Sequence, residues 1–295
     1  MSRFRIAAQP INWINDDFRD LGADISLERA LDDMVEAGFE GTELGHRFPA
    51  SGAAIRELLA PRGLSLAGAW HSTHLASRPW SEELAAFDRH ADRLHAAGAS
   101  VIILAECTGA IHGDGSRPLG KGDQRGQLDE GGWRALCEGL DRLAQRAALR
   151  GMKTAYHPHM GTVVQTAADV DTLLAGTREL GLLLDTGHLA FAGDDPMITL
   201  EKHGARVTHV HTKDVRFAVA RQARAESWSF ERAVRGGVFT VPGDGDVDFA
   251  SILGEINRNG YSGWLVVEAE QDPKVANPLT YAKQGRATLR RLLGA

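Results

Sequence analysis

The chain has 295 residues, of which 43% are hydrophobic and 24% are charged, and its formal net charge is −6 at pH 7. This composition is typical of a globular protein with a large core, and the acidic balance argues against a surface that binds nucleic acid or an anionic membrane. The sequence has two cysteines without metal-ligand spacing, no long apolar run and no leader pattern at its N-terminus. These features predict a reduced, cytoplasmic protein.

Short apolar runs alternate along the chain with amphipathic segments. The predicted strands cover residues 4–8, 41–44, 64–70, 101–105, 153–156, 182–184, 207–210 and 264–267. Helical patterns follow nearly every strand, at 26–37, 53–59, 81–97, 132–149, 167–174, 197–203, 249–257 and 279–293. Because buried parallel strands are continuous apolar runs, this order predicts a single-domain α/β protein, a (β/α)8 TIM barrel over residues 1–295. An open doubly wound sheet is the alternative.

Two segments interrupt the alternation. A Gly-rich polar loop at 109–132 is too long for a simple connection, which makes it a candidate lid. Charged residues at 217–236 predict a helical insertion. Its charged face is either solvated or a contact between copies in a homo-oligomer.

Polar side chains stand at the end of every predicted strand. The clearest cases are 182–191, where an apolar run leads into Asp185 and His188, and 207–215, where one leads into His211 and Lys213. The carboxyl ends of barrel strands surround one shared cavity, so the sequence predicts a functional site there. The full set is Asn12, Trp13, Glu43, His71, His74, Glu106, His157, His159, Asp185, His188, His211, Lys213, Glu268 and Glu270.

Four of these residues form a candidate metal site. Mixed imidazole and carboxylate ligands suit Mn²⁺, Co²⁺, Fe²⁺ or Zn²⁺ better than Ca²⁺ or Mg²⁺. Each residue taken singly has an ordinary structural explanation, such as a buried ion pair or a hydrogen-bonded core histidine. The four together favour a metal. They are His157, Asp185, His211 and Glu268.

Three further residues are candidates for catalysis beside the metal. His159 lies two residues past the first ligand and therefore shares its face of an extended segment; it either acts on the substrate or supports a ligand. His188 either orients a substrate hydroxyl or supports a ligand. Lys213 next to a divalent ion has its ammonium form disfavoured, or it stabilises an oxyanion. A salt bridge from Lys213 to Glu270 or Asp214 is the alternative.

At these residues the chain resembles the xylose isomerase-like TIM-barrel superfamily of isomerases, epimerases and dehydratases. The shared motifs of the second half are Asp185-Thr-Gly-His188, His209-Val-His211-Thr-Lys213-Asp214 and Val267-Glu268. Within the superfamily the chain is similar to the inosose dehydratases of myo-inositol catabolism, on motifs that run through the whole sequence. These are Gln9-Pro10-Ile11-Asn12-Trp13, Glu43-Leu44-Gly45, Trp70-His71-Ser72-Thr73, Leu104-Ala105-Glu106, Tyr156-His157-Pro158-His159-Met160-Gly161-Thr162 and Glu268-Ala269-Glu270-Gln271-Asp272-Pro273.

The resemblance implies a divalent metal at His157, Asp185, His211 and Glu268, with Mn²⁺ or Co²⁺ expected first and Zn²⁺ or Fe²⁺ as alternatives. In most of the superfamily the strand-five ligand is a glutamate, whereas this chain has His157. The exchange removes a negative charge, and it also removes a carboxylate that epimerases use as an acid or base. It therefore favours dehydration over epimerisation.

The resulting hypothesis is metal-dependent removal of water from 2-keto-myo-inositol, which gives a trihydroxycyclohexanedione. The metal is the expected Lewis acid at the carbonyl. His159 is the expected base, with Glu268 as the fallback, and the proton for the leaving hydroxyl comes from the same imidazolium or from His188. Lys213 completes the catalytic set. The residues expected to bind the substrate are Trp13, Glu43, His71 and Glu106.

Three other functions fit parts of this pattern. A ketose or cyclitol isomerase or epimerase would use the same barrel and differ only in its product. An endonuclease IV-like DNA-repair enzyme would need a basic surface, which the net charge of −6 does not favour. A non-catalytic sugar-binding barrel would not need the intact ligand set. The expected partner is thus a small cyclitol ketone, with no nucleic acid and no membrane.

Overall fold

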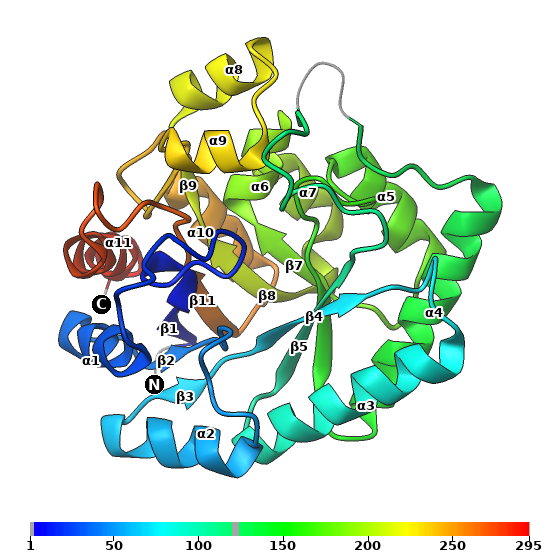
Figure 1. The fold of residues 1–295 in the computed structure, drawn as a ribbon, viewed down its shortest axis with the longest axis horizontal. Coiled ribbons are helices and arrows are strands. Elements are labelled where there is room, and N and C mark those ends of the chain that lie inside the picture. The colour runs from blue at the N-terminus through cyan, green and yellow to red at the C-terminus, as the bar shows by residue number, and fades with distance from the viewer. Residues whose placement is uncertain (1–2, 120–123, 295) are drawn as a thin grey trace.

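A computed structural model describes residues 3–119 and 124–294. Nine strands form one parallel sheet in the order β3-β2-β1-β11-β8-β7-β6-β5-β4, which curls around the centre of the molecule (Figure 1). Their bounds are β1 (Phe4–Ala8), β2 (Gly41–Thr42), β3 (Ser65–Leu66), β4 (Ala69–Thr73), β5 (Val101–Glu106), β6 (Lys153–Tyr156), β7 (Leu182–Asp185), β8 (Val207–Thr212) and β11 (Gly263–Val267).

The two ends of this sheet belong to one extended segment of the chain. β3 pairs with β2, whereas β4 pairs with β5, and only Ala67 and Gly68 separate them. The Ala67 amide still donates to the Thr42 carbonyl, and the Leu44 amide donates to the Gly68 carbonyl. The sheet therefore closes into a barrel with eight strand positions, which confirms the predicted (β/α)8 fold. The predicted strand at 64–70 is corrected: it is interrupted where its pairing partner changes, and it continues to Thr73.

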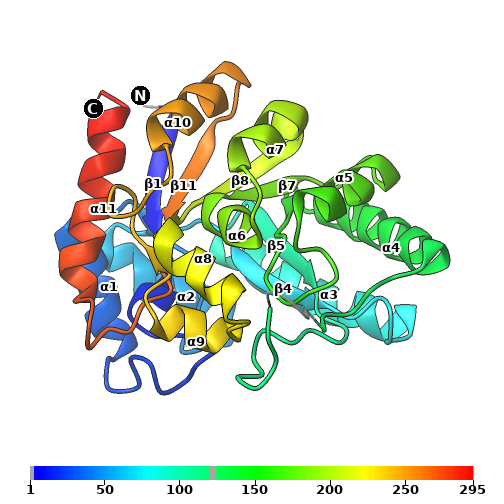
Figure 2. The ribbon, with the colours of Figure 1, turned by 90° about the horizontal axis from the view of Figure 1, so that it is seen from above.

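Helices surround the barrel (Figures 1 and 2). The α-helices are α1 (Leu27–Ala37), α2 (Gly52–Leu59), α3 (Trp80–Ala97), α4 (Glu130–Ala148), α5 (Ala167–Gly176), α6 (Thr186–Ala192), α7 (Pro196–His203), α8 (Phe217–Ala225), α9 (Phe230–Arg235), α10 (Phe249–Arg258) and α11 (Pro278–Leu292). Short 3-10 helices cover Pro10–Asn12, Ala60–Arg62 and Gly204–Arg206. No helix among the described residues is both long and apolar enough to cross a membrane.

Local sequence signals set the ends of these helices, as α1 illustrates. The Ser26 hydroxyl accepts a hydrogen bond from the Arg29 amide at the first turn, and Gly38 ends the helix with a φ of 86°. A serine N-cap and a left-handed glycine after the last turn are favourable because they satisfy or redirect the free backbone groups of helix ends. The apolar side of α1, which includes Leu31 and Met34, is buried in the main core.

A second apolar cluster lies apart from the main core and is made largely by loops that follow the strands. We call it the cap cluster; its large members are Phe18, Ile111, Met160, Phe191, Phe230 and Phe239. One of these rings, Phe230, comes from the segment 217–236, for which the sequence predicts a helical insertion. There α8 and α9 lie side by side (Figure 1), and β10 (Phe239–Thr240) pairs antiparallel with β9 (Asp214–Val215). In the long loop after β5, residues 120–123 lie outside the described residues.

Candidate functional site

The four candidate ligands lie together because their strands are neighbours. β6, β7, β8 and β11 are adjacent in the sheet, and His157, Asp185, His211 and Glu268 stand at or just beyond their carboxyl ends. The Asp185 Oδ2 atom is 3.3 Å from His157 Nε2 and 3.6 Å from His211 Nδ1, and His211 Nδ1 is 2.7 Å from Glu268 Oε2. Donor atoms that bind one ion at about 2.1 Å lie roughly 3.0–3.4 Å apart, so the spacing of His157, Asp185 and His211 is close to that of a ligand set. Glu268 adjoins this group through His211 and forms a second metal-capable group with Asp185 and His188.

The hydrogen bonding of these residues also fits a cation. Both ring nitrogens of His157 and the Asp185 Oδ2 atom are buried without a hydrogen-bond partner among the described residues. Buried polar atoms are normally satisfied. Burial lowers the pKa of His157 to about 4, although Asp185 partly opposes this shift, so its imidazole is neutral and has a lone pair to donate. The donor set therefore suits a divalent ion that accepts both nitrogen and oxygen ligands.

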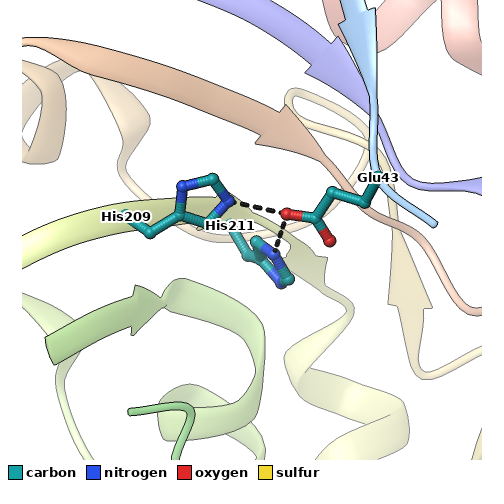
Figure 3. A group of neighbouring side chains, drawn as sticks. All are labelled: Glu43, His209 and His211. Atoms are coloured by element: carbon teal, nitrogen blue, oxygen red, sulfur yellow. Dashed lines mark hydrogen bonds and ion pairs between the residues drawn. The ribbon is translucent and has the colours of Figure 1, made fainter. Parts of the chain in front are cut away.

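His211 is oriented from behind by a buried carboxylate (Figure 3). His209 and His211 lie two residues apart on β8, and both point toward Glu43, which follows β2. Glu43 Oε1 is 2.6 Å from His209 Nε2 and 3.1 Å from His211 Nε2. Burial disfavours the ionised form of Glu43, but His211 and His209 overcome this and lower its pKa to about 2. A carboxylate that holds one ring nitrogen of a ligand histidine fixes its orientation.

The carboxylates around His211 favour a positive charge on its imidazole. Burial opposes protonation of the His211 imidazole, yet Glu43 and Glu268 raise its pKa well above the usual value. Metal ions compete with protons for such nitrogen atoms. The same carboxylates that attract a proton would therefore also attract a metal cation.

Lys213 is fully buried beneath the candidate metal site. Its Nζ atom lies 2.6 Å from Glu268 Oε1, 2.6 Å from Glu270 Oε2 and 2.9 Å from His188 Nε2. Burial disfavours the ammonium form, but Glu268 and Glu270 outweigh it and raise the pKa of Lys213 above its ordinary value. A side chain on Gly187 would collide with the Lys213 stem, so the glycine makes room for it.

The two salt-bridge partners that the sequence suggests for Lys213, Glu270 and Asp214, have different roles in the structure. The bridge to Glu270 is present, whereas the Asp214 carboxylate accepts hydrogen bonds from the backbone amides of the following turn. Those amides belong to Val215, Gly243, Gly245 and Val247. Asp214 therefore shapes the turn after β10 rather than balancing the charge of Lys213.

His159 is held in one tautomer by its own loop. Its Nδ1 atom is 3.0 Å from the Met160 carbonyl oxygen; a carbonyl only accepts, so Nδ1 carries the hydrogen and Nε2 has the lone pair. Burial, and then the charges of His188 and His112, hold the pKa of His159 well below its usual value. His159 is thus a neutral imidazole that is able to accept a proton at Nε2.

A cavity of about 640 Å³ opens in front of these residues, within the usual range for small-molecule sites. Its lining includes Glu43, His157, His159, His211, Glu268 and Glu270. Asp16, Asp17, His46, Trp70 and His112 also line it, and the rings of Trp70 and His112 lie within 5.3 Å of the His159 ring. Among the predicted catalytic and metal-binding residues, Asp185, His188 and Lys213 do not line the cavity and are buried.

Two residues expected to bind substrate point into the helical layer instead. Trp13 is fully buried, and its indole nitrogen donates to Asp33 of α1 at 3.0 Å. The His71 ring packs 5.6 Å from the ring of Phe87 in α3, and its Nε2 atom is 3.4 Å from Glu83 Oε1. Neighbouring residues of a strand face opposite sides, which is why Trp70 lines the cavity and His71 does not. These two assignments are corrected.

Glu106 is likewise turned away from the cavity. It is fully buried, and its Oε2 atom accepts hydrogen bonds from the Thr73 hydroxyl at 2.8 Å and from the Leu75 amide at 2.9 Å. The Thr108 amide donates to its other oxygen at 3.3 Å. Glu106 therefore organises the loops after β4 and β5. The prediction that it binds substrate is corrected, because its carboxylate is already occupied by these donors.

Sequence reasoning left several cavity or site residues unassigned, among them His209, Asp17 and His112. His209 carries a usable signal, because it precedes His211 by two residues and so shares its strand face. Asp17 and His112 lie in loops without periodic pattern, and only the folded chain brings them to the cavity.

Comparisons with known proteins agree with this architecture. A family profile described as xylose isomerase-like TIM barrel matches residues 31–292. The "Inosose dehydratase" of Geobacillus thermodenitrificans is 43% identical over 295 residues, which cover 99% of this chain and 98% of the relative. The "Rhizopine catabolism protein MocC" of Rhizobium meliloti is 45% identical and covers 99% of this chain and 89% of the relative.

A solved structure shares the fold at low sequence identity. The "IOLI protein with a binding zinc atom" superposes with a TM-score of 0.71 at 13% identity, over 98% of both chains. On these matches, the chain belongs to the xylose isomerase-like TIM barrel family and groups within it with the inosose dehydratases.

Proposed function

We propose that this protein is a metal-dependent inosose dehydratase, which removes water from 2-keto-myo-inositol to give a trihydroxycyclohexanedione. The observation that carries the proposal is the position of His159 on the cavity wall, with a free Nε2 atom, beside the four clustered ligands. The curated relatives that are named inosose dehydratase support the choice of substrate.

In this proposal the divalent metal is held by His157, Asp185, His211 and Glu268. When bound, it supplies a Lewis acid for the ketone oxygen and a neighbouring hydroxyl. Mixed nitrogen and oxygen donors favour Mn²⁺ or Co²⁺, with Zn²⁺ and Fe²⁺ as alternatives.

His159 is the proposed base, which takes the proton from the carbon next to the ketone. Its tautomer leaves Nε2 free for that proton. Glu268 is the weaker candidate, because one of its oxygens faces His211 at 2.7 Å and the other faces Lys213 at 2.6 Å. Lys213 and His188 lie behind the cavity wall, so we assign them to positioning: Lys213 holds Glu268 in place, and the His188 ring lies 4.4 Å from the His159 ring.

The test is turnover of 2-keto-myo-inositol by metal-stripped protein, before and after addition of Mn²⁺ or Co²⁺. We expect a metal-dependent product that has lost one water, seen by its mass and its ultraviolet absorbance. Replacing the base, His159→Gln, should lower kcat by roughly 10²–10⁴-fold, whereas His95→Gln on the exposed end of α3 should not. A product of unchanged mass would instead identify an isomerase or epimerase, and a fully active His159→Gln variant would remove the base assignment.

A further inference from the structure

Dehydration needs a proton for the departing hydroxide as well as a base. A hydroxide ion is a poor leaving group, and an acid at the right position contributes much of the rate. The sequence suggests two donors for this task, the imidazolium of the base itself and His188. The structure argues against His188, because it is fully buried behind the cavity wall, against Lys213 and Glu270.

His112 faces the cavity next to the proposed base. It lies in the loop after β5, its ring centre is 4.8 Å from that of His159, and its side chain remains 17% exposed. The Nδ1 atom of His112 is buried and has no hydrogen-bond partner among the described residues. A substrate in the cavity therefore has two neighbouring imidazoles within its reach.

The loop that carries His112 is fixed against the loop that carries His159. The Ile111 amide donates to the Gly161 carbonyl at 2.9 Å, and Ile111 packs in the cap cluster. Gly161 has a φ of 72°, and a side chain there would come within 2.8 Å of the His112 backbone nitrogen. The glycine of the His-Pro-His-Met-Gly segment thus permits the close approach that sets the distance between the two histidines.

Asp17 is an acidic neighbour of His112 in the lining of the cavity. Its Oδ1 atom is 3.8 Å from His112 Nε2, a gap that one water molecule or a small shift closes. The Asn15 Oδ1 atom accepts a hydrogen bond from the Asp17 amide at 2.8 Å, which fixes the turn that carries Asp17. Burial, Glu270 and Asp16 raise the pKa of Asp17 to about 7, whereas burial lowers the pKa of the His112 imidazole. Asp17 is therefore the member of the pair that can store a proton at neutral pH, and His112 passes it on, accepting at Nε2, which faces Asp17, and donating from Nδ1, which has no hydrogen-bond partner among the described residues.

We propose that His112 is the general acid of this reaction and receives its proton through Asp17. The assignment rests on the proposed dehydratase function. His159 takes the proton of the carbon next to the ketone, and the electrons of that C–H bond form a C=C bond. The C–O bond of the β-hydroxyl breaks with its electron pair going to oxygen. His112 protonates this oxygen, so that water leaves, and no oxidant or reductant is needed.

The test compares two substrates that differ in whether the leaving group must be protonated by an acid. One is 2-keto-myo-inositol; the other is its analogue with fluorine in place of the leaving hydroxyl, because fluoride departs without protonation. We expect His112→Gln to lower kcat for the hydroxyl substrate by about 10²-fold or more and to change kcat for the fluoro substrate far less. Asp17→Asn should show a smaller loss with the same selectivity. His159→Gln should lose both reactions, since each begins at the C–H bond.

The melting temperature and Mn²⁺ affinity of each variant show whether the fold and the ligand cluster are preserved, with His95→Gln as the matched histidine control. Equal losses on both substrates, or full activity of His112→Gln, would overturn the assignment of His112. A wild-type protein that binds metal but eliminates neither water from the hydroxyl substrate nor fluoride from its analogue would overturn the proposed function, and this assignment would fall with it.

Discussion

Glu43 shows how one residue outside the ligand set can control it. Its carboxylate contacts the ring nitrogens of both His209 and His211, so Glu43→Gln exchanges a charged partner of the ligand histidine for a neutral amide. Loss of such a supporting carboxylate typically costs 10–100-fold in metal affinity, and we expect a rise of about that size in the Kd for Mn²⁺, measured by calorimetric titration. Glu36→Gln, on the exposed side of α1, is the control. An unchanged Kd would show that His211 needs no orientation by Glu43.

Single residues also show what sequence reasoning can and cannot assign. His157, Asp185, His211 and Glu268 were open to prediction because each ends an apolar run on a different strand, and the structure gathers them. His71 stands in an equally suggestive place, but its strand is interrupted near Gly68, so the side that each residue faces could not be counted reliably from the sequence. The direction of a side chain depends on strand register, which length and composition do not determine.

The insertion of α8 and α9 brings a buried aromatic ring to the site. Phe230 of α9 is fully buried, and its ring lies 5.6 Å from that of His159 and 6.0 Å from that of His188. Phe230→Ala should lower the free energy of unfolding by roughly 3–5 kcal/mol, measured by urea denaturation, and should also lower kcat because the His159 ring loses its support. Phe217→Ala, at a ring that is 36% exposed in the same insertion, should change both much less. Similar losses in the two variants would mean that α9 does not support the site.

Secondary-structure elements were predictable to the extent that they carry long periodic patterns. α1, α3, α4 and α11 were evident for this reason. α6 was not, because it has seven residues and begins at the end of β7, where Asp185 accepts hydrogen bonds from the Gly187 and His188 amides. One carboxylate thus caps a helix and faces the candidate metal site. The pairing of β9 with β10 could not be predicted from periodicity either, because each of these strands has only two residues.

Across the whole molecule, the site concentrates negative charge in the barrel interior. Four buried carboxylates, Glu43, Asp185, Glu268 and Glu270, surround the cationic groups of Lys213 and His211. Burying charges that are incompletely balanced destabilises a fold, so a divalent cation bound among them should stabilise the native state over the unfolded chain, which has no preformed site.

Calorimetric melting of metal-stripped protein tests this linkage. Mn²⁺ at about 100 times its Kd should add about 2.7 kcal/mol to the free energy of unfolding, which corresponds to an increase in Tm of roughly 4–8 °C for a chain of this size. Asp185→Asn removes a carboxylate from the centre of the cluster, so its Tm should respond much less to the same Mn²⁺ concentration. Because the Asn side chain can still accept the amide hydrogen bonds that cap α6, the variant separates metal binding from helix capping. An equal Tm increase in wild type and variant would place the stabilising ion elsewhere in the protein.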